Sequence, residues 1–214
     1  MIFQKSLQDI FSKEVLFFVF KTASLSLILT LFLTWGLGDN LASFIASYLS
    51  WIPWEWLQTT GASVMAFAFS YMLFIIFMSI FTALYSEPLL ISLAKKHYPH
   101  RAVIDSPKIS VSLFLTLKSA FWALVLFIVF LPVFFIPILG QVFLVYIWSI
   151  LLKDASIYDV GTLFVADKQI LKNKSKKARL IAMIASLFNL IPFVNIFASV
   201  FAQIVFLHYI LAND

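Results

Sequence analysis

Long uninterrupted apolar stretches, and not the alternation of a water-soluble fold, dominate this chain of 214 residues. The first covers residues 15–37 and the second residues 61–85. Both exceed the roughly 20 apolar residues that a helix needs to cross a bilayer. The only charge inside them is Lys21, near the start of the first. We therefore predict two transmembrane helices, preceded by a short interfacial helix over residues 1–14.

The stretch between these spans, residues 38–60, is predicted as an external loop. Gly38, Asp39 and Asn40 are residue types that end or cap helices, so the first span should stop there. Apolar residues then recur at helical spacing opposite three serines, which predicts an interfacial helix beside a tryptophan belt. The apolar face consists of Leu41, Phe44, Ile45, Tyr48, Leu49 and Ile52, and the belt of Trp35, Trp51, Trp54 and Trp56.

Two further apolar regions, residues 119–152 and 180–210, are each interrupted by an Ile-Pro pair. Each half holds only about 14–17 residues, which is shorter than a full crossing. We therefore predict an all-α integral membrane fold. It combines the two long spans with two proline-broken helical hairpins that penetrate the membrane only partly. The alternative is that each of these regions forms two thin full spans.

The two predicted hairpins resemble each other at their bends. Each has Ile-Pro, two apolar residues and then Gly140 or Asn195, residue types that tolerate left-handed backbone. This similarity predicts a weak internal repeat. A helix restarting at Gly140–Gln141 or at Asn195 would leave N–H groups with partial positive charge, which can bind an anion inside a membrane. The alternative is a pair of simple turns in a packed bundle.

The basic residues fall in three blocks, residues 5–21, 95–118 and 153–179. The positive-inside rule places these blocks in the cytoplasm, together with both termini and the segments 86–118 and 153–179. A bacterial inner membrane is the expected location. The formal charge of +5 is spread over loops beside the membrane, which favours anionic lipid headgroups. We expect no nucleic-acid partner, since no nucleic-acid motif is present.

Composition agrees with a single membrane domain over residues 1–214. Hydrophobic residues make up 63% and charged residues 12%, whereas soluble domains have about 45–50% and 25%. The first apolar run is too long for the core of a signal peptide, so we expect it to be retained. Cysteine is absent, which excludes disulfides and thiolate metal sites. We expect no cofactor.

Candidate chemistry outside the hairpins is sparse. His97 and His100 could share one helical face, but Pro99 lies between them and no third ligand is near in the sequence, so we expect no metal site. Asp154, Asp159 and Asp167 lie among lysines, and solvated ion pairs or helix caps are favoured over a proton relay. Motifs for phosphate binding, nucleophilic catalysis or zinc hydrolysis are absent, so we expect no enzyme.

The bends at residues 136–140 and 191–197, with His208-Tyr209 near the end, resemble the CysZ sulfate-permease family and its etoposide-induced relatives. The resemblance covers most of the chain. It implies two long spans, two partly penetrating hairpins, an oligomer, and uptake of sulfate for cysteine synthesis. The Gly-Leu-Arg element of the sulfate permeases has no counterpart, because the matching stretch reads Phe11-Ser12-Lys13-Glu14.

These observations give one leading hypothesis and one alternative. The leading hypothesis is a permease or channel for sulfate or another small anion, acting as a homo-oligomer among membrane lipids. Three lysines would draw the anion and three residues at the hairpin bends would coordinate it: Lys13, Lys21 and Lys118, and Gly140, Gln141 and Asn195. The alternative is a membrane protein that organises lipid or partner proteins without transport.

Overall fold

A computed structural model describes residues 2–50, 55–191 and 193–212, and this part of the chain is mostly helical, without strands. The helices are α1 (Ile2–Ile10), α2 (Lys13–Leu49), α3 (Glu55–Tyr85), α4 (Glu87–His97), α5 (Ile109–Val129), α6 (Leu139–Phe164), α7 (Lys168–Ser186) and α8 (Ala198–Leu211). Three 3₁₀ turns accompany them: η1 (Leu131–Phe135), η2 (Leu187–Leu190) and η3 (Val194–Phe197).

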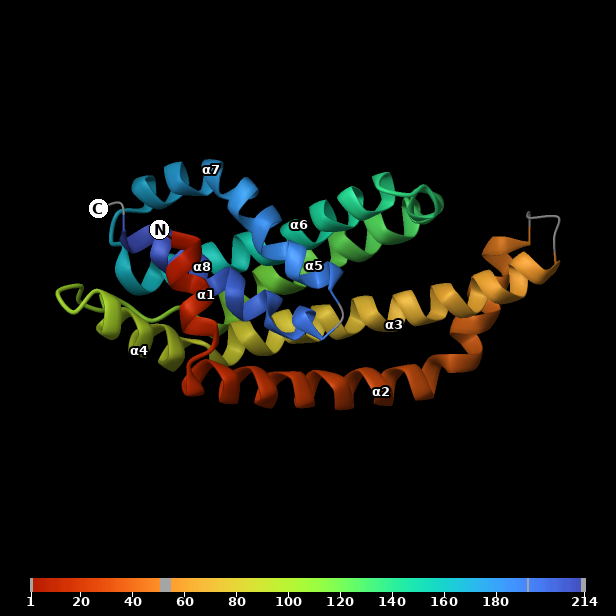
Figure 1. The fold of residues 1–214 in the computed structure, drawn as a ribbon, viewed down its shortest axis with the longest axis horizontal. Helices are drawn as coiled ribbons and strands as arrows, with labels where there is room; N and C mark the ends of the chain where they lie inside the picture. Colours follow the sequence, from red (N-terminus) through yellow and green to blue (C-terminus); the bar gives the residue numbers. More distant parts are fainter. Residues whose placement is uncertain (1, 51–54, 192, 213–214) are drawn as a thin grey trace.

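The helices form an elongated bundle around α8. Figure 1 shows α2 and α3 as a long antiparallel pair, with both termini, α1 and α4 gathered at one end of the molecule. Every residue of α8 except Tyr209 is buried, because α1, α3, α4, α6 and α7 surround this helix. A second core, which includes Ile75, Ala123 and Trp148, joins α3, α5 and α6.

Within the described residues, five helical segments are long and apolar enough to cross a membrane. The outer faces of α2 and α5 carry large apolar side chains, including Phe17, Ile28 and Phe32 on α2 and Phe114 and Phe121 on α5, each at least 60% exposed. Water would not tolerate such a surface, whereas lipid does. The protein is therefore a multi-pass membrane protein. The five segments are Lys13–Leu37, Thr60–Tyr85, Ile109–Val129, Leu139–Phe164 and Val194–Leu211.

The prediction that the helix stops at Gly38, Asp39 and Asn40 is wrong, although the spanning segment ends at Leu37 as predicted. The helix continues without a break to Leu49. Its extension packs on α3, since Ile45 is buried and contacts a cluster around Met65. This packing outweighs the local preference of the three residues to end a helix.

Only part of the predicted interfacial face and aromatic belt can be followed in the structure. Phe44 and Trp35 are 55% and 86% exposed. The remaining predicted positions lie outside the described residues or side chains, namely Leu41, Tyr48, Leu49, Trp51, Ile52, Trp54 and Trp56.

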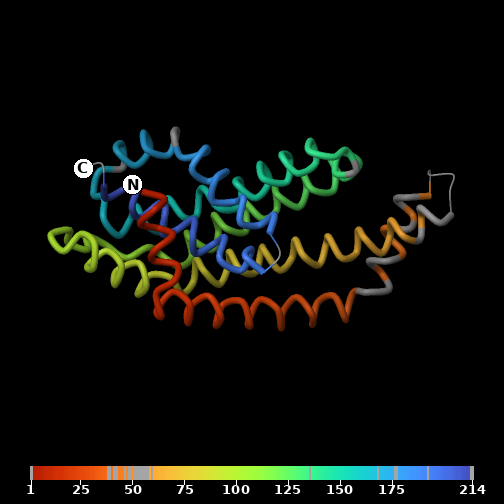
Figure 2. Tube along the Cα trace, in the orientation of Figure 1, coloured from red at the N-terminus to blue at the C-terminus, as the bar shows by residue number. Residues whose placement is uncertain are grey.

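The first hairpin has longer arms than the sequence predicted. Its arms α5 and α6 hold 21 and 26 residues, on the order of 30 and 40 Å of helix. The sequence count stopped at Lys118 and Lys153, but both lysines lie inside the helices. The length argument for partial penetration therefore fails for this hairpin. In the second hairpin, Ala178–Leu190 remains shorter than a span, and Figure 2 shows its turn beside the middle of α3.

The two hairpin bends share one backbone design, although the left-handed residue is not the one predicted. Ile138 and Phe193, each directly after the proline, have φ of 67° and 65°, and no described glycine has a positive φ. The N–H groups of Gly140 and Asn195 donate to the carbonyl oxygens of residues 136 and 191 at 3.0 and 3.1 Å. Corresponding bends thus recur 55 residues apart, as an internal repeat requires.

Candidate functional site

A cavity of about 580 Å³ lies between α2, α3 and the bend of the second hairpin. Its margin includes Phe20, Phe67 and Phe193, which are 60%, 75% and 87% exposed, so the cavity opens at the surface. Its wall is largely apolar but contains hydroxyl and amide groups. The polar wall residues are Ser24, Thr30, Thr34, Ser70, Tyr71 and Asn195.

The hydroxyl groups on α2 follow the four-residue spacing of one helix face. The stripe consists of Thr22, Ser26, Thr30 and Thr34, and each hydroxyl donates to the carbonyl oxygen four residues earlier at 2.7–3.0 Å. These bonds allow hydroxyl groups to lie inside a membrane without an unpaired donor. The stripe therefore provides oxygen atoms along the inner face of α2, and its last two members reach the cavity.

The second hairpin brings one amide side chain, that of Asn195, to the same place. The hydroxyl of Tyr71 donates to the backbone carbonyl oxygen of Asn189, which ties α3 to the turn. Asn195 is 6% exposed and lines the cavity from η3. Of the predicted anion ligands, Asn195 is thus the one found at this cavity.

The predicted lysines are dispersed over the surface. Lys13 begins α2, Lys118 lies inside α5, and both are exposed. Lys21 is exposed on α2 with its Nζ 5.2 Å from the centre of the Tyr85 ring, and no lysine lines the cavity as described. These lysines would therefore attract an anion from the protein surface.

The first hairpin bend is separate from this cavity. Gln141 lines an apolar cavity of about 360 Å³ between α6 and α7. Gly140 is buried against Phe134, and its N–H is already bonded within the turn. An anion could use the N–H of Gly140 or of Asn195 only after these turn bonds had broken. The roles of Gly140 and Gln141 remain predictions.

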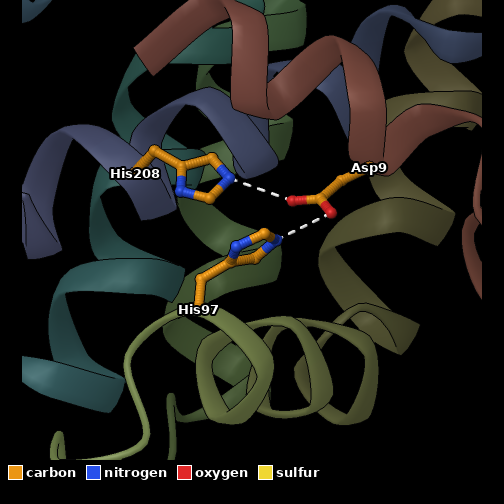
Figure 3. A group of neighbouring side chains, drawn as sticks. All are labelled: Asp9, His97 and His208. Carbon is orange, nitrogen blue, oxygen red and sulfur yellow. Dashed lines mark hydrogen bonds and ion pairs between the residues drawn. The ribbon is translucent and has the colours of Figure 1, made fainter. Parts of the chain in front are cut away.

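A cluster that the sequence did not reveal joins α1, α4 and α8 near both termini. Figure 3 shows His97 and His208 directed toward opposite oxygens of the Asp9 carboxylate. The His97 Nε2–Oδ1 distance is 2.8 Å and the His208 Nε2–Oδ2 distance is 3.0 Å. Lys96 donates to Oδ1 at 3.0 Å, and the hydroxyl of Tyr98 lies 3.0 Å from His208 Nδ1.

Burial and hydrogen bonding oppose each other at Asp9. The side chain is 1% exposed, and this burial acts to raise the pKa of the carboxyl group. Hydrogen bonds from His97, Lys96 and His208 favour the carboxylate and leave the pKa below its ordinary value. Burial also raises the pKa of the Tyr98 hydroxyl, with a smaller contribution from the Asp9 charge. The cluster therefore holds a buried carboxylate between two imidazoles.

The sequence singled out His97 but paired it with the wrong residue. His100 is exposed beyond the end of α4, whereas His97 meets Asp9 and His208. Asp9 and His208 are 199 residues apart in the chain. No spacing pattern links residues so distant, so only the three-dimensional fold identifies the cluster.

A second buried carboxyl group lies within α6. Asp159 is 1% exposed, and its Oδ2 accepts a hydrogen bond from Gln203 Nε2 of α8 at 3.1 Å. The expectation of a solvated ion pair or helix cap is therefore wrong for this aspartate, because the fold turns it toward α8. Asp154 pairs with Lys153 at 2.9 Å, and Asp167 caps α7 by accepting from the Gln169 N–H. Those two aspartates confirm the expectation.

Comparison with known proteins gives one result. The family model described as "Sulfate transporter CysZ/Etoposide-induced protein 2.4" matches residues 2–199 of the chain. No curated protein and no solved structure gives a match.

Proposed function

Because the chain belongs to the sulfate transporter CysZ/etoposide-induced protein family, we propose that it is a permease that admits sulfate or a similar small oxyanion to the cytoplasm. The family gives the membrane transport role, while the anion and the direction are part of the proposal. The observation that carries it is the cavity between α2, α3 and the second hairpin. Its polar lining consists of hydroxyl and amide groups within an apolar wall.

Neutral donors suit an anion that must enter and leave again. An oxyanion can accept a hydrogen bond from the Asn195 amide. It can accept bonds from the cavity hydroxyls, such as those of Thr30 and Thr34, once these have turned away from the backbone carbonyls to which they donate. A fixed charge within the membrane would hold it more tightly and would cost more to bury. The surface lysines, Lys13, Lys21 and Lys118, would raise the local anion concentration without binding the anion in the cavity.

The orientation is also proposed from charge. The termini and α4 lie at one end of the molecule (Figure 1), and the basic blocks include the segments around them. This arrangement supports a cytoplasmic location for that end under the positive-inside rule. Membrane lipid and further copies of this chain would then cover the exposed apolar faces of α2 and α5.

The test is uptake of labelled sulfate by proteoliposomes that contain the purified protein. The double variant Thr30→Val with Thr34→Val removes two cavity hydroxyls and keeps the side-chain shape, and we expect slower uptake. Thr22→Val is the matched control, because Thr22 has the same type of back bond on the same face but lies outside the cavity wall. Uptake equal to that of empty liposomes would remove the proposal.

One observation favours a second candidate function. The cavity opens between exposed phenylalanines and is walled mostly by apolar side chains such as Leu27 and Phe74, which an acyl chain would fit. The protein would then bind or organise lipid without transporting an anion. That function predicts lipid retained at a fixed ratio through purification and no sulfate flux.

A further inference from the structure

We propose that Asp9, His97 and His208 form a binding site for a zinc-class divalent metal ion that joins α1, α4 and α8. One ligand atom from each residue lies within 4.8 Å of the other two. The three residues come from the beginning, the middle and the end of the chain. The proposal is independent of the transported species, since the cluster shares no residue with the cavity wall.

The ligand types match the chemistry of first-row transition metals. Two imidazole nitrogens and one carboxylate oxygen are a common set for Zn²⁺ and Fe²⁺, with further positions left for water. With metal–ligand distances of about 2.0–2.1 Å, tetrahedral ligand atoms lie roughly 3.3 Å apart. The His97 and His208 contacts to Asp9 measure 2.8 and 3.0 Å. These contacts reach different oxygens of the carboxylate, so admitting the ion requires Asp9 to turn as well as the contacts to open.

A neighbouring hydroxyl already orients one of the imidazoles. Tyr98 lies at Nδ1 of His208, on the side of the ring away from Asp9. In a metal site this hydroxyl oxygen would accept a hydrogen bond from Nδ1–H, which leaves the Nε2 lone pair directed at the ion. Metal-bound histidines usually have such a second partner. Burial also favours metal binding at this cluster, because the side chains of His208 and Asp9 are 0% and 1% exposed.

Two lysines near the cluster bear on the electrostatics. Lys96 donates to the Asp9 oxygen that also contacts His97, but its side chain is 57% exposed and can move into solvent when the ion binds. Lys5 lies over the Tyr98 ring, with Nζ 5.6 Å from the centroid. Binding would displace Lys96 and require each imidazole to carry its proton on Nδ1 and not on Nε2, so affinity should rise when Lys96 is replaced by methionine.

The experiment titrates the purified full chain in detergent with Zn²⁺ by calorimetry and with Co²⁺ by visible absorption. We expect one ion per chain and an absorption spectrum typical of Co²⁺ with a low coordination number. His97→Ala and His208→Ala should each weaken binding at least about tenfold, and Tyr98→Phe by about tenfold. His100→Ala is the matched control, because His100 lies three residues from His97 but outside the cluster, and it should bind as the unchanged protein does.

Size-exclusion profiles would show whether the variants stay folded. If His208→Ala fails to fold, His97→Ala decides the question, since its side chain is only partly buried. Absence of binding by the unchanged protein would overturn the proposal. Equal binding by folded His97→Ala would overturn it too, and so would loss of binding in His100→Ala with binding retained in His97→Ala.

Discussion

Gly140 at the start of α6 lies directly against the backbone of Phe134 in the preceding turn. A Cβ atom built on Gly140 would stand 2.7 Å from the Phe134 Cα and 2.9 Å from its carbonyl oxygen. Both neighbours are backbone atoms, which cannot move without unfolding the turn. The glycine is therefore required for close packing at the first bend, although its φ is not positive.

This contact predicts that Gly140→Ala destabilises the protein. Alanine in a helix normally gains up to about 1 kcal/mol over glycine, but the clash should reverse the sign and cost roughly 2 kcal/mol. Gly36→Ala is the control, since no atom of the described residues lies within 4 Å of its added Cβ and α2 should be slightly stabilised. Thermal unfolding in detergent measures both. A Gly140→Ala protein as stable as the Gly36→Ala protein would contradict the packing described.

The left-handed backbone at the first bend gives a second prediction. Ile138 has φ 67° and ψ −53°, and the Leu139 N–H donates to the carbonyl oxygen of residue 137 at 2.8 Å, as in a strained γ-turn. Such a conformation costs a branched residue about 1–3 kcal/mol, and the side chain is 76% exposed. Ile138→Gly should therefore raise the free energy of unfolding by about 1 kcal/mol.

Ile136→Gly separates strain relief from a general effect of glycine. Ile136 is also exposed but has an ordinary φ of −90°. This variant should lose a little stability by chain entropy, on the order of 0.5–1 kcal/mol. Chemical denaturation measures the free energy of unfolding of both variants. Equal losses in the two would argue against strain at Ile138.

Asp9→Ala tests how far the cluster near the termini stabilises the fold in the absence of added metal. The change removes the acceptor of bonds from Lys96, His97 and His208 and leaves a buried imidazole without its partner. We expect a loss of about 3 kcal/mol in unfolding free energy. Glu14→Ala is the control, because Glu14 is exposed and accepts one bond from Ser92 at the surface, so its loss should be below about 1 kcal/mol.

Lys118→Ala addresses the proposed attraction of anions by surface charge. Uptake of labelled sulfate should fall roughly two- to ten-fold at low ionic strength, and the difference should shrink as salt is added. Lys172→Ala, an exposed lysine on α7, should leave uptake nearly unchanged. A loss that persists undiminished at high salt would speak against long-range attraction by Lys118.

Hydropathy predicts the spanning helices of this protein well, but their ends poorly. Residues 15–37 and 61–85 lie in helices because a long apolar stretch leaves lipid-exposed backbone no other way to pair its polar groups. Helix α2 continues past the predicted stop at Gly38–Asn40 to Leu49, and Ile45 in this extension packs on α3. Lys118 and Lys153 mark a change in composition, and the helices continue through both.

Some features of the candidate sites could be predicted from the sequence, and others could not. The repeated Ile-Pro bends were visible in the sequence, yet the positive φ falls on Ile138 and Phe193 because the turn geometry, and not residue preference, selects the position. The hydroxyl stripe on α2 has a four-residue period that the sequence also contains, from Thr22 to Thr34. Pairing Asp9 with His208 requires the packing of α1 on α8, which no local pattern encodes.

Accessibility of the cavity in lipid tests the transport account most directly, and the absence of cysteine makes it practical. Thr34→Cys places a single thiol on the cavity wall, and Ile28→Cys places one on the exposed outer face of α2. In proteoliposomes we predict that a water-soluble thiol reagent modifies Thr34→Cys, that sulfate slows this reaction, and that Ile28→Cys stays unmodified. An unreactive Thr34→Cys, or a reaction rate that sulfate does not change, would contradict the proposed anion path.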